Sequence, residues 1–431
     1  MRNRTQQPRA GELSERGISR RELLALGFAA AGACICMPAF GAGSAGGAAN
    51  TGGAANTGGG GLTLSSRKGI IPDSTLASVG PLGEPDANGV RLPAGFSSRI
   101  VARSGQRPVA ARDFVWHDAP DGGAAFAAPD GGWIYVSNAE VIRPPGGGAS
   151  ALRFARNAEL VDAYPVLRGT IGNCAGGPTP WGTWLSCEEH PTGLVWECDP
   201  RGVAQARALP LLGAFDHEAV AVDPRTMQLY LTEDRPDGSW YRFTPARVAG
   251  GRPDLSSGRL EVAEIVPDGK GRVRWHVVPD PAGTNEPTRA QVPASTAFRG
   301  GEGCWHAGGF IYFTTKHDNR VWAYEIAHQR LNVIYDRSSS DNPILHDVDN
   351  VVTAPRGEVL VAEDNGDMQI VALSANGATT PIAQVPGHTG SEVAGPAFDP
   401  SGTRLYFSSQ RGASGRNSDG VTYEISGPFR G

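Results

Sequence analysis

The sequence lacks three features that would each point to a well-known class of protein. Its 39 lysine and arginine residues are outnumbered by 44 acidic residues, which leaves no basic excess to neutralise nucleic-acid phosphates. Beyond the first forty residues, no apolar run is long enough to span a bilayer. Gly-x-Ser-x-Gly, P-loop and His-Glu-x-x-His patterns are also absent, so serine-hydrolase, nucleotide-binding and zincin chemistry have no support.

Helical periodicity is nearly absent as well, outside the N-terminal segment. The 431 residues instead include 59 glycines and 33 prolines, an abundance typical of many short strands joined by turns. A chain of this length can hold two or three average domains, but closed all-β architectures also reach this size as one unit. The composition therefore favours an all-β protein.

The N-terminal segment has the pattern of an export signal. Arg20 and Arg21 stand immediately before an apolar run from Leu23 to Phe40. Because paired arginines before such a run are typical of bacterial Tat export, we expect residues 1–45 to be a Tat signal peptide that engages the Tat translocon. The alternative is a basic tail followed by a chance apolar patch. The Tat route often carries folded proteins with bound cofactors, so this signal favours a metal site in a periplasmic or secreted protein.

A low-complexity tract separates this signal from the rest of the chain. Gly41 to Gly61 repeats the sequence Gly-Gly-Ala-Ala-Asn-Thr. Such a composition cannot bury enough apolar surface to order itself. We therefore expect residues 46–61 to be a linker and residues 62–431 to form a single folded domain.

Six similar segments predict the fold. In each, a turn rich in Gly, Pro or Asp precedes four or five β-forming residues, and polar or acidic residues follow; the copies are 133–138, 184–189, 229–234, 311–316, 359–364 and 405–410. They recur roughly every 50 residues, the length of a propeller blade, except across one interval of roughly 80. We predict a six-bladed β-propeller with an insertion between the third and fourth repeats, near residues 244–300. A pair of β-sandwiches is the alternative.

A second polar position recurs about fifteen residues before the strand ends. It is occupied by Cys174, Glu218, Glu302, Asp349 and Glu392, and the first repeat fits loosely with His117 and Asp118 ahead of Asn138. Equivalent positions in successive blades lie at equal height around one axis. We therefore expect one thiol and four carboxylates in a ring at one end of the channel, although a turn cap or a solvated strand end is the alternative for any single acid.

Such a ring predicts metal ions. Several carboxylates facing one another repel strongly, and their burial is costly unless cations balance the charge. Carboxylates are hard ligands suited to calcium or ferric iron, whereas a thiolate selects a transition metal. The mixed ring therefore predicts more than one kind of ion, and the strand-end acids Glu188 and Glu363 are further candidates to bind metal or to orient the ring.

The remaining cysteines and histidines carry weaker signals. Cys187 and Cys198 flank a predicted hairpin, where a disulfide is one alternative in an oxidising compartment. Cys304, beside Trp305, is predicted to be a small buried residue.

The segment Asn173-Cys174-Ala175-Gly176-Gly177-Pro178-Thr179-Pro180-Trp181-Gly182-Thr183, followed by Cys187-Glu188-Glu189, resembles the PhoX family of Tat-exported alkaline phosphatases. The resemblance continues in residues 215–220, 363–365 and 391–396. It implies a six-bladed propeller that holds ferric and calcium ions and hydrolyses phosphate monoesters. It also implies that Cys174 binds iron and that Glu302 and Glu392 are the iron-binding glutamates of the family.

The family has an arginine shortly before the first of these glutamates, in an Arg-Pro-Glu setting. Here the sequence is Arg299-Gly300-Gly301-Glu302, which lacks the proline and shifts the arginine by one residue. The resemblance makes Arg299 the candidate residue that contacts phosphate during catalysis.

We therefore predict a metal-dependent phosphatase acting on small phosphorylated substrates, with Fe³⁺ and Ca²⁺ as cofactors. The predicted metal-binding residues are Cys174, Glu188, Glu218, Glu302, Asp349, Glu363 and Glu392. One alternative is a calcium-dependent propeller lactonase or esterase, which would not need the thiol. Another is a non-catalytic metal-binding propeller. We expect a monomer with no nucleic-acid partner and no stable membrane span.

Overall fold

The structure is a computed structural model that describes residues 62–73, 75–143 and 146–430. The expected export signal and linker, residues 1–61, lie outside this description. Within the described part, regular structure consists of strands and of four short 3-10 helices: η1 (Leu76–Ser78), η2 (Pro210–Leu212), η3 (Thr288–Ala290) and η4 (Asn417–Asp419). The all-β prediction is confirmed. No helix among these residues has the length and apolar character needed to cross a membrane.

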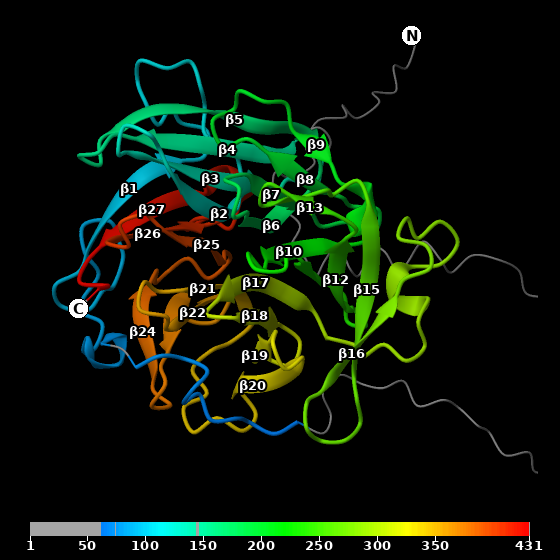
Figure 1. Ribbon diagram of the computed structural model, residues 1–431. Coiled ribbons are helices and arrows are strands. Elements are labelled where there is room, and N and C mark those ends of the chain that lie inside the picture. The colour runs from blue at the N-terminus through cyan, green and yellow to red at the C-terminus, as the bar shows by residue number, and fades with distance from the viewer. Residues whose placement is uncertain (1–61, 74, 144–145, 431) are drawn as a thin grey trace, which may run out of the picture. The chain divides into compact units, whose positions relative to one another are not determined.

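The strands form antiparallel sheets, the blades, which follow one another along the chain (Figure 1). Blade 1 contains β2 (Pro120–Ala127), β3 (Trp133–Ala139), β4 (Gly147–Phe154) and β5 (Leu160–Thr170). Blade 2 contains β6 (Asn173–Pro178), β7 (Trp184–Glu188), β8 (Val195–Cys198) and β9 (Arg207–Ala208). Blade 3 contains β10 (His217–Val222), β11 (Leu229–Glu233), β12 (Trp240–Pro245), β15 (Gly258–Ile265) and β16 (Val273–Val277).

The second half of the chain repeats this arrangement. Blade 4 contains β17 (Gly301–Ala307), β18 (Phe310–Thr315), β19 (Arg320–Glu325) and β20 (Arg330–Asp336). Blade 5 contains β21 (Val348–Thr353), β22 (Val359–Glu363), β23 (Gln369–Leu373) and β24 (Thr379–Gln384). Blade 6 contains β25 (Val393–Phe398), β26 (Arg404–Ser409), β27 (Val421–Ser426) and β1 (Ser97–Arg103).

The blades close into a ring. The first strand of each blade contacts the first strand of the next, from β2 through β6, β10, β17, β21 and β25 and back to β2. The ring is also joined at its outer side, because β1 pairs with β27 from Ser97↔Ser426 to Arg103↔Val421. In Figure 1 this places the early, blue-cyan β1 beside the red β27. The six-bladed propeller prediction is confirmed.

The long third interval also behaves as predicted. It adds a fifth strand, β16, to blade 3 and a separate two-stranded sheet formed by β13 (Val248–Ala249) and β14 (Arg252–Pro253). A connection that contains η3 then leads to blade 4.

The hydrophobic core lies between neighbouring blades. The buried clusters combine side chains from adjacent sheets; Trp240 of blade 3, for example, stacks on Phe313 of blade 4 with ring centroids 4.6 Å apart. Burial of one such side chain contributes about 1.5–3 kcal/mol. Because both faces of a blade are covered, all residues of β22 are buried. This explains why the repeats are continuous apolar runs and not alternating patterns.

Candidate metal centre

The same backbone hydrogen bond occurs in every blade at the end near the candidate site. It joins the end of the second strand to the start of the first strand. The amide that follows the second strand donates to a carbonyl just before the first strand, as from Glu189 N to Gly172 O (2.8 Å). The residues two positions after these carbonyls form what we term the first-strand ring: Asp121, Cys174, Glu218, Glu302, Asp349 and Ala394. The donating residues form the second-strand ring: Glu140, Glu189, Asp234, Lys316, Asp364 and Gln410.

A β-bulge occurs beside the first-strand ring in all six blades. In blade 2, for example, the pairing register shifts between Asn173 and Gly176; the other blades shift at the matching place. Bulges redirect side chains and are common beside functional sites. Here they follow from small residues after the ring, which let the strands approach closely: a Cβ on Gly303 would lie 2.5 Å from Val351 N. The bulges therefore place the ring side chains at the axis.

The axis is narrow beyond this ring. The residues that follow the ring residues line a cavity of about 30 Å³; they are Gly122, Ala175, Ala219, Gly303, Asn350 and Gly395. A cavity of this size holds little more than water. A molecule much larger than water therefore does not fit in this part of the axis.

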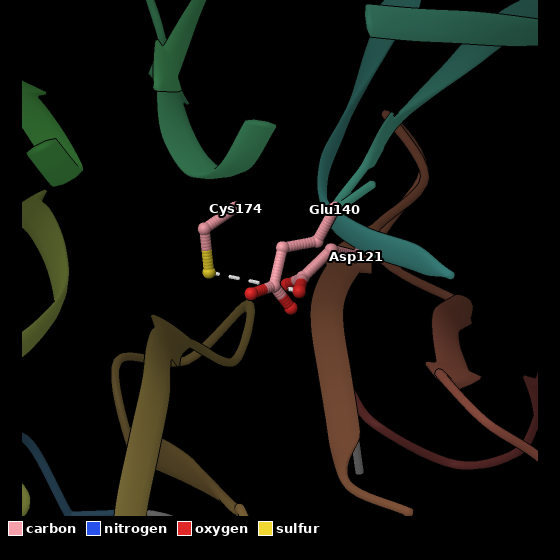
Figure 2. A group of neighbouring side chains, drawn as sticks. All are labelled: Asp121, Glu140 and Cys174. Carbon is pink, nitrogen blue, oxygen red and sulfur yellow. Dashed lines mark hydrogen bonds between the residues drawn. The ribbon is translucent and has the colours of Figure 1, made fainter. Parts of the chain in front are cut away.

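Donor atoms of the two rings converge in three overlapping groups. The first group is Asp121, Glu140 and Cys174 (Figure 2), the second is Cys174, Glu189 and Glu218, and the third is Glu218, Glu302 and Asp349. Within each group the donor atoms lie within 4.8 Å of one another. Because Cys174 and Glu218 each belong to two groups, the donors form one continuous series across blades 1 to 5.

The thiol lies in the middle of this series. Cys174 is buried, and its Sγ lies 2.9 Å from Glu218 Oε1 and 3.6 Å from Asp121 Oδ2. The carboxylates of Glu218 and Asp121 are themselves almost fully buried. A thiolate between two buried carboxylates would be strongly repelled unless a cation lay among them. The set combines one soft donor with several hard ones, which fits bound metal ions of more than one kind.

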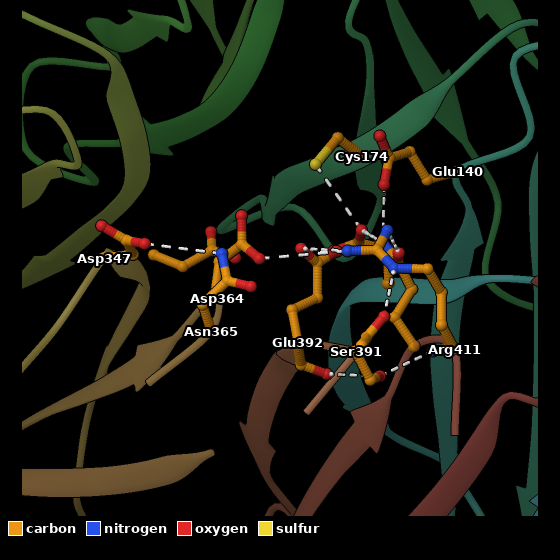
Figure 3. Close-up of polar contacts among 12 residues, drawn as sticks. Glu140, Cys174, Asp347, Asp364, Asn365, Ser391, Glu392 and Arg411 are labelled. Atoms are coloured by element: carbon orange, nitrogen blue, oxygen red, sulfur yellow. Dashed lines mark hydrogen bonds and ion pairs between the residues drawn. The ribbon is translucent and has the colours of Figure 1, made fainter. Parts of the chain in front are cut away.

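Two basic side chains, from Lys316 and Arg411, complete the site on the side of blades 4 to 6; Figure 3 shows Arg411 beside Glu392. Lys316 Nζ lies 2.7 Å from Glu302 Oε1 and 3.0 Å from Asp364 Oδ2. Arg411 Nη2 lies 3.1 Å from Glu392 Oε2 and 3.9 Å from Asp364 Oδ1. Lys316 occupies the second-strand ring position at which blades 1, 2, 3 and 5 carry an acid.

The amide side chains of Asn138 and Gln410 hold residues of the two rings in place through hydrogen bonds. Asn138 Nδ2 donates to Cys174 O (3.2 Å) and Ala175 O (2.7 Å), which ties blade 1 to the thiol-bearing strand. Gln410 Nε2 donates to Asp121 and to Glu140 Oε2, while its carbonyl accepts from Arg411 Nη1. Gln410 thus links the basic side of the site to the first donor group.

The structure brings together four of the predicted metal-binding residues. Cys174, Glu218, Glu302 and Asp349 all belong to the first-strand ring and to the donor groups. Glu392 precedes the equivalent position of blade 6, which Ala394 holds, and its carboxylate instead pairs with Arg411. In blade 1 the ring position belongs to Asp121, three residues after the expected Asp118.

Glu188 and Glu363 lie at the second-strand ends but not in the donor groups. Side chains alternate along a strand, so the residue next to a ring position faces the other way. Glu188 accepts hydrogen bonds from Ile171 N, Leu194 N and Trp196 Nε1. Burial alone would raise the pKa of Glu188, but these bonds and one from His190 outweigh it and lower the pKa.

Glu363 has a corresponding role in blade 5. Its carboxylate accepts from His346 N (2.9 Å) and Gln369 N (3.0 Å), and burial raises its pKa to about 7. Both glutamates therefore hold turns at the end of a blade. Arg299 is exposed, its charge acts on His317 and Asp318, and it lies outside the ring positions.

Sequence reasoning missed Asp121, Glu140, Glu189, Asp364, Lys316 and Arg411. A signal for two of them was present, because Glu189 and Asp364 directly follow the predicted Glu188 and Glu363. To choose between two neighbouring acids, one must know which face of the strand points to the axis. The bulges interrupt the regular alternation of side chains, so this face cannot be found by counting residues.

The cysteines away from the axis are free thiols in the part of the chain described. Cys187 pairs across the hairpin with Val195, and Cys198 pairs with Trp184, so the two cysteines are not opposite each other and form no disulfide. Burial raises the pKa of Cys198 to about 12, which keeps the thiol protonated. Cys304 is buried, as predicted.

The fold and the site define a class of protein, a closed six-bladed propeller with a candidate metal centre on its axis. The sequence matches the family model described as alkaline phosphatase PhoX over residues 134–194 and 190–334. The chain is therefore similar to the PhoX family over this part of its sequence. The matched residues include Cys174, Glu218 and Glu302, whereas Asp349 and Arg411 lie beyond them.

One solved structure shares the fold, and a second is similar to a lesser degree. PhoX from Pseudomonas fluorescens, determined in complex with the transition-state analogue vanadate, is 16% identical in sequence, with 83% of this chain and 98% of that one covered and a TM-score of 0.66. A gluconolactonase from Xanthomonas campestris is 13% identical, with 83% of this chain and 97% of that one covered and a TM-score of 0.41. No curated protein matches the chain.

Proposed function

We propose that the chain is a metal-dependent phosphatase that hydrolyses phosphate monoesters. The observation that carries this proposal is a buried thiol, Cys174, among axial carboxylates in a chain that matches the PhoX family. The presence of vanadate in Pseudomonas fluorescens PhoX supports phosphoryl transfer as the chemistry performed on this fold.

The donor groups suggest how the ions are divided. The groups that contain Cys174 suit ferric iron, because a thiolate favours a transition metal over calcium. The group of Glu218, Glu302 and Asp349 offers only carboxylate oxygen, which suits calcium. Metal ions held there would supply the concentrated positive charge that transfer of a phosphoryl dianion requires.

The chain itself prepares the site for that charge. The ring carboxylates are rigidly held, since each first strand pairs with the second strand of its blade and contacts the first strands of both neighbouring blades, and Asn350 Nδ2 donates to Asp349 Oδ1. Their burial excludes bulk water, which strengthens every charge interaction inside the site. The narrow axis behind the rings keeps the substrate at the ring end.

Substitution of the thiol tests the proposal. Cys174→Ser should remove iron from the purified protein and lower turnover of a chromogenic phosphate monoester by at least about 100-fold, a loss of the size seen when a metal-dependent step fails. Cys187→Ala is the matched control, because Cys187 is equally buried but lies in the apolar core between blades 2 and 3. It should keep both iron and activity.

The same assay separates the competing functions. A Cys174→Ser protein that is free of iron and fully active would contradict the proposal. Turnover of a lactone without turnover of the phosphate ester would indicate a calcium-dependent lactonase instead. Bound metal with neither activity would indicate a binding protein.

We further propose that residues 1–45 direct export through the Tat route, that residues 46–61 are a linker and that residues 62–431 fold as one monomeric domain. The paired Arg20 and Arg21 support this proposal. Replacing both with lysine should retain the protein in the cytoplasm, as measured by cell fractionation. Unchanged export would contradict it.

A further inference from the structure

Two basic side chains converge on one carboxylate at the mouth of the site. Lys316 Nζ lies 3.0 Å from Asp364 Oδ2, and Arg411 Nη2 lies 3.9 Å from Asp364 Oδ1. The two cations thus approach different oxygens of the same anionic group, the Asp364 carboxylate. This spacing fits a small anion with several oxygens, and a phosphoryl group has that shape.

Both cations are held firmly. Lys316 also pairs with Glu302, at 2.7 Å. Arg411 is fixed through its backbone as well as its side chain: its amide donates to Ser391 Oγ (2.8 Å) and its Nε donates to Gly390 O (3.3 Å). Arg411 Nη1 donates to Gln410, which in turn binds the acids of blade 1. A guanidinium held in this way presents its donors in a fixed direction.

The cations are more accessible than the acids beside them. The side chains of Lys316 and Arg411 are 11% and 16% exposed, whereas those of Glu302 and Glu392 are 0% exposed. An anion that enters from solvent therefore meets the two cations, together with Asp364, which is 7% exposed, before it reaches Glu302 and Glu392. These carboxylates would otherwise repel it.

We propose that Lys316 and Arg411 bind the phosphoryl group of the substrate. They would take the role that the sequence resemblance implied for Arg299. The inference rests on the proposed function and adds to it the residues that contact the substrate. Arg411 supplies directional hydrogen bonds to two phosphoryl oxygens, and Lys316 supplies a point charge. Asp364 pairs with both cations through different carboxylate oxygens and so holds them at one place.

Binding of inorganic phosphate tests this proposal without relying on turnover. The full-length, metal-loaded protein is titrated with phosphate by calorimetry, and iron and calcium are measured in each preparation. Arg411→Gln and Lys316→Gln should each weaken phosphate binding by about tenfold or more, the loss expected for one charge-assisted hydrogen bond, while iron content stays unchanged. Arg411→Lys keeps the charge and should give an intermediate dissociation constant.

Arg153→Gln is the matched control. Arg153 is 18% exposed and pairs with Asp130 at 2.5 Å, but it lies at the opposite end of blade 1 from the rings. It should leave phosphate binding unchanged. If Arg411→Gln does not fold, Arg411→Lys and Lys316→Gln still provide the comparison.

Several results would overturn the inference. One is a dissociation constant for phosphate within twofold of the natural protein in the Arg411 and Lys316 variants. Another is tenfold weaker binding in Arg299→Gln but not in those variants. Failure of the natural protein to bind phosphate at millimolar concentration would also overturn it. Phosphate binding that depends on Arg411 and Lys316, in a protein that cleaves no monoester, would support the inference and contradict the proposed function.

Discussion

At the scale of residues, Glu188 and Glu189 are neighbours at the end of one strand but have different roles, because their side chains point to opposite faces of the sheet. Glu189 carries a donor atom of the second metal-binding group, next to Cys174 and Glu218. Glu188 faces the other way and accepts hydrogen bonds from two backbone amides and an indole. The same division recurs in blade 5, where Glu363 holds a turn and Asp364 faces the two cations. One position along the strand therefore separates a structural acid from one that faces the axis.

Substitution of this pair tests the division. In protein stripped of metal with a chelator, Glu188→Ala should lower the free energy of unfolding at pH 7 by about 1–3 kcal/mol, because buried donors lose their acceptor. The pKa of Glu188 is lowered by folding, so its stabilising effect is present above the unfolded value of 4.5. It is lost as the pH falls through the folded pKa, and the difference between variant and natural protein should shrink below pH 4.5. Urea titrations of both proteins at several pH values measure this difference in the free energy of unfolding.

Glu189→Ala should behave in the opposite way. It should lower the metal content of the purified protein, which Glu188→Ala should leave unchanged, because the Glu189 carboxylate lies among the donor atoms of Cys174 and Glu218. Loss of metal in Glu188→Ala together with full metal content in Glu189→Ala would contradict this assignment.

At the scale of elements, the repeated bulge and the small residues around it determine how closely the blades approach the axis. Gly177 in β6 shows the constraint most directly, because a Cβ there would lie 1.7 Å from Val220 O in β10. These two strands also carry Cys174 and Glu218, whose Sγ and Oε1 atoms are 2.9 Å apart. Packing between the blades and the geometry of the donors are therefore coupled.

Gly177→Ala should separate these strands. We expect a loss of about 3 kcal/mol in unfolding free energy from overpacking against rigid backbone, together with reduced iron content. Gly83→Ala is the control, since its Cβ would meet nothing closer than Leu92 O at 3.4 Å. Thermal unfolding and metal analysis measure both effects, and equal stability of the two variants would count against the coupling.

The elements also show what sequence reasoning can and cannot reach. The six apolar runs predicted the second strands well, because burial on both faces leaves a clear signal in sequence. The ring residues were harder to place. The spacing found Cys174, Glu218, Glu302 and Asp349, but a bulge beside each ring position moves the register, and in blades 1 and 6 the nearest acids were not the equivalent residues.

At the scale of the whole molecule, the ring of blades closes through β1 and β27, which lie at opposite ends of the described chain. A single strand so far from its partner leaves no periodic signal, so this closure could not be predicted from the repeat. Closure also brings blade 6 beside blade 1, where Gln410 binds Asp121 and Glu140. The site is therefore complete only when the ring is closed.

The closed ring has an uneven distribution of charge around its axis. The ring positions of blades 1 to 3 hold acids and the thiol: Asp121, Glu140, Cys174, Glu189, Glu218 and Asp234. Blades 4 to 6 include Lys316, Gln410 and Ala394 at ring positions, and Arg411 follows the last of the second strands. Blades 4 and 5 also hold acids at ring positions, namely Glu302, Asp349 and Asp364. We therefore propose that the ring acids of blades 1 to 5 bind metal and that the cations of blades 4 and 6 bind the anion. The thiol of Cys174 and the cation of Lys316 stand at ring positions where most other blades carry an acid, and both lie at the proposed site.

Metal analysis of the natural protein, combined with a phosphatase assay, tests the central claim most directly. Protein exported through the Tat route and purified without chelator should contain iron and calcium and should cleave a chromogenic phosphate monoester. Removal of the metal should abolish that activity, and return of both ions should restore it. Full phosphatase activity in protein that contains no iron or calcium, or no activity in protein loaded with both, would contradict the account.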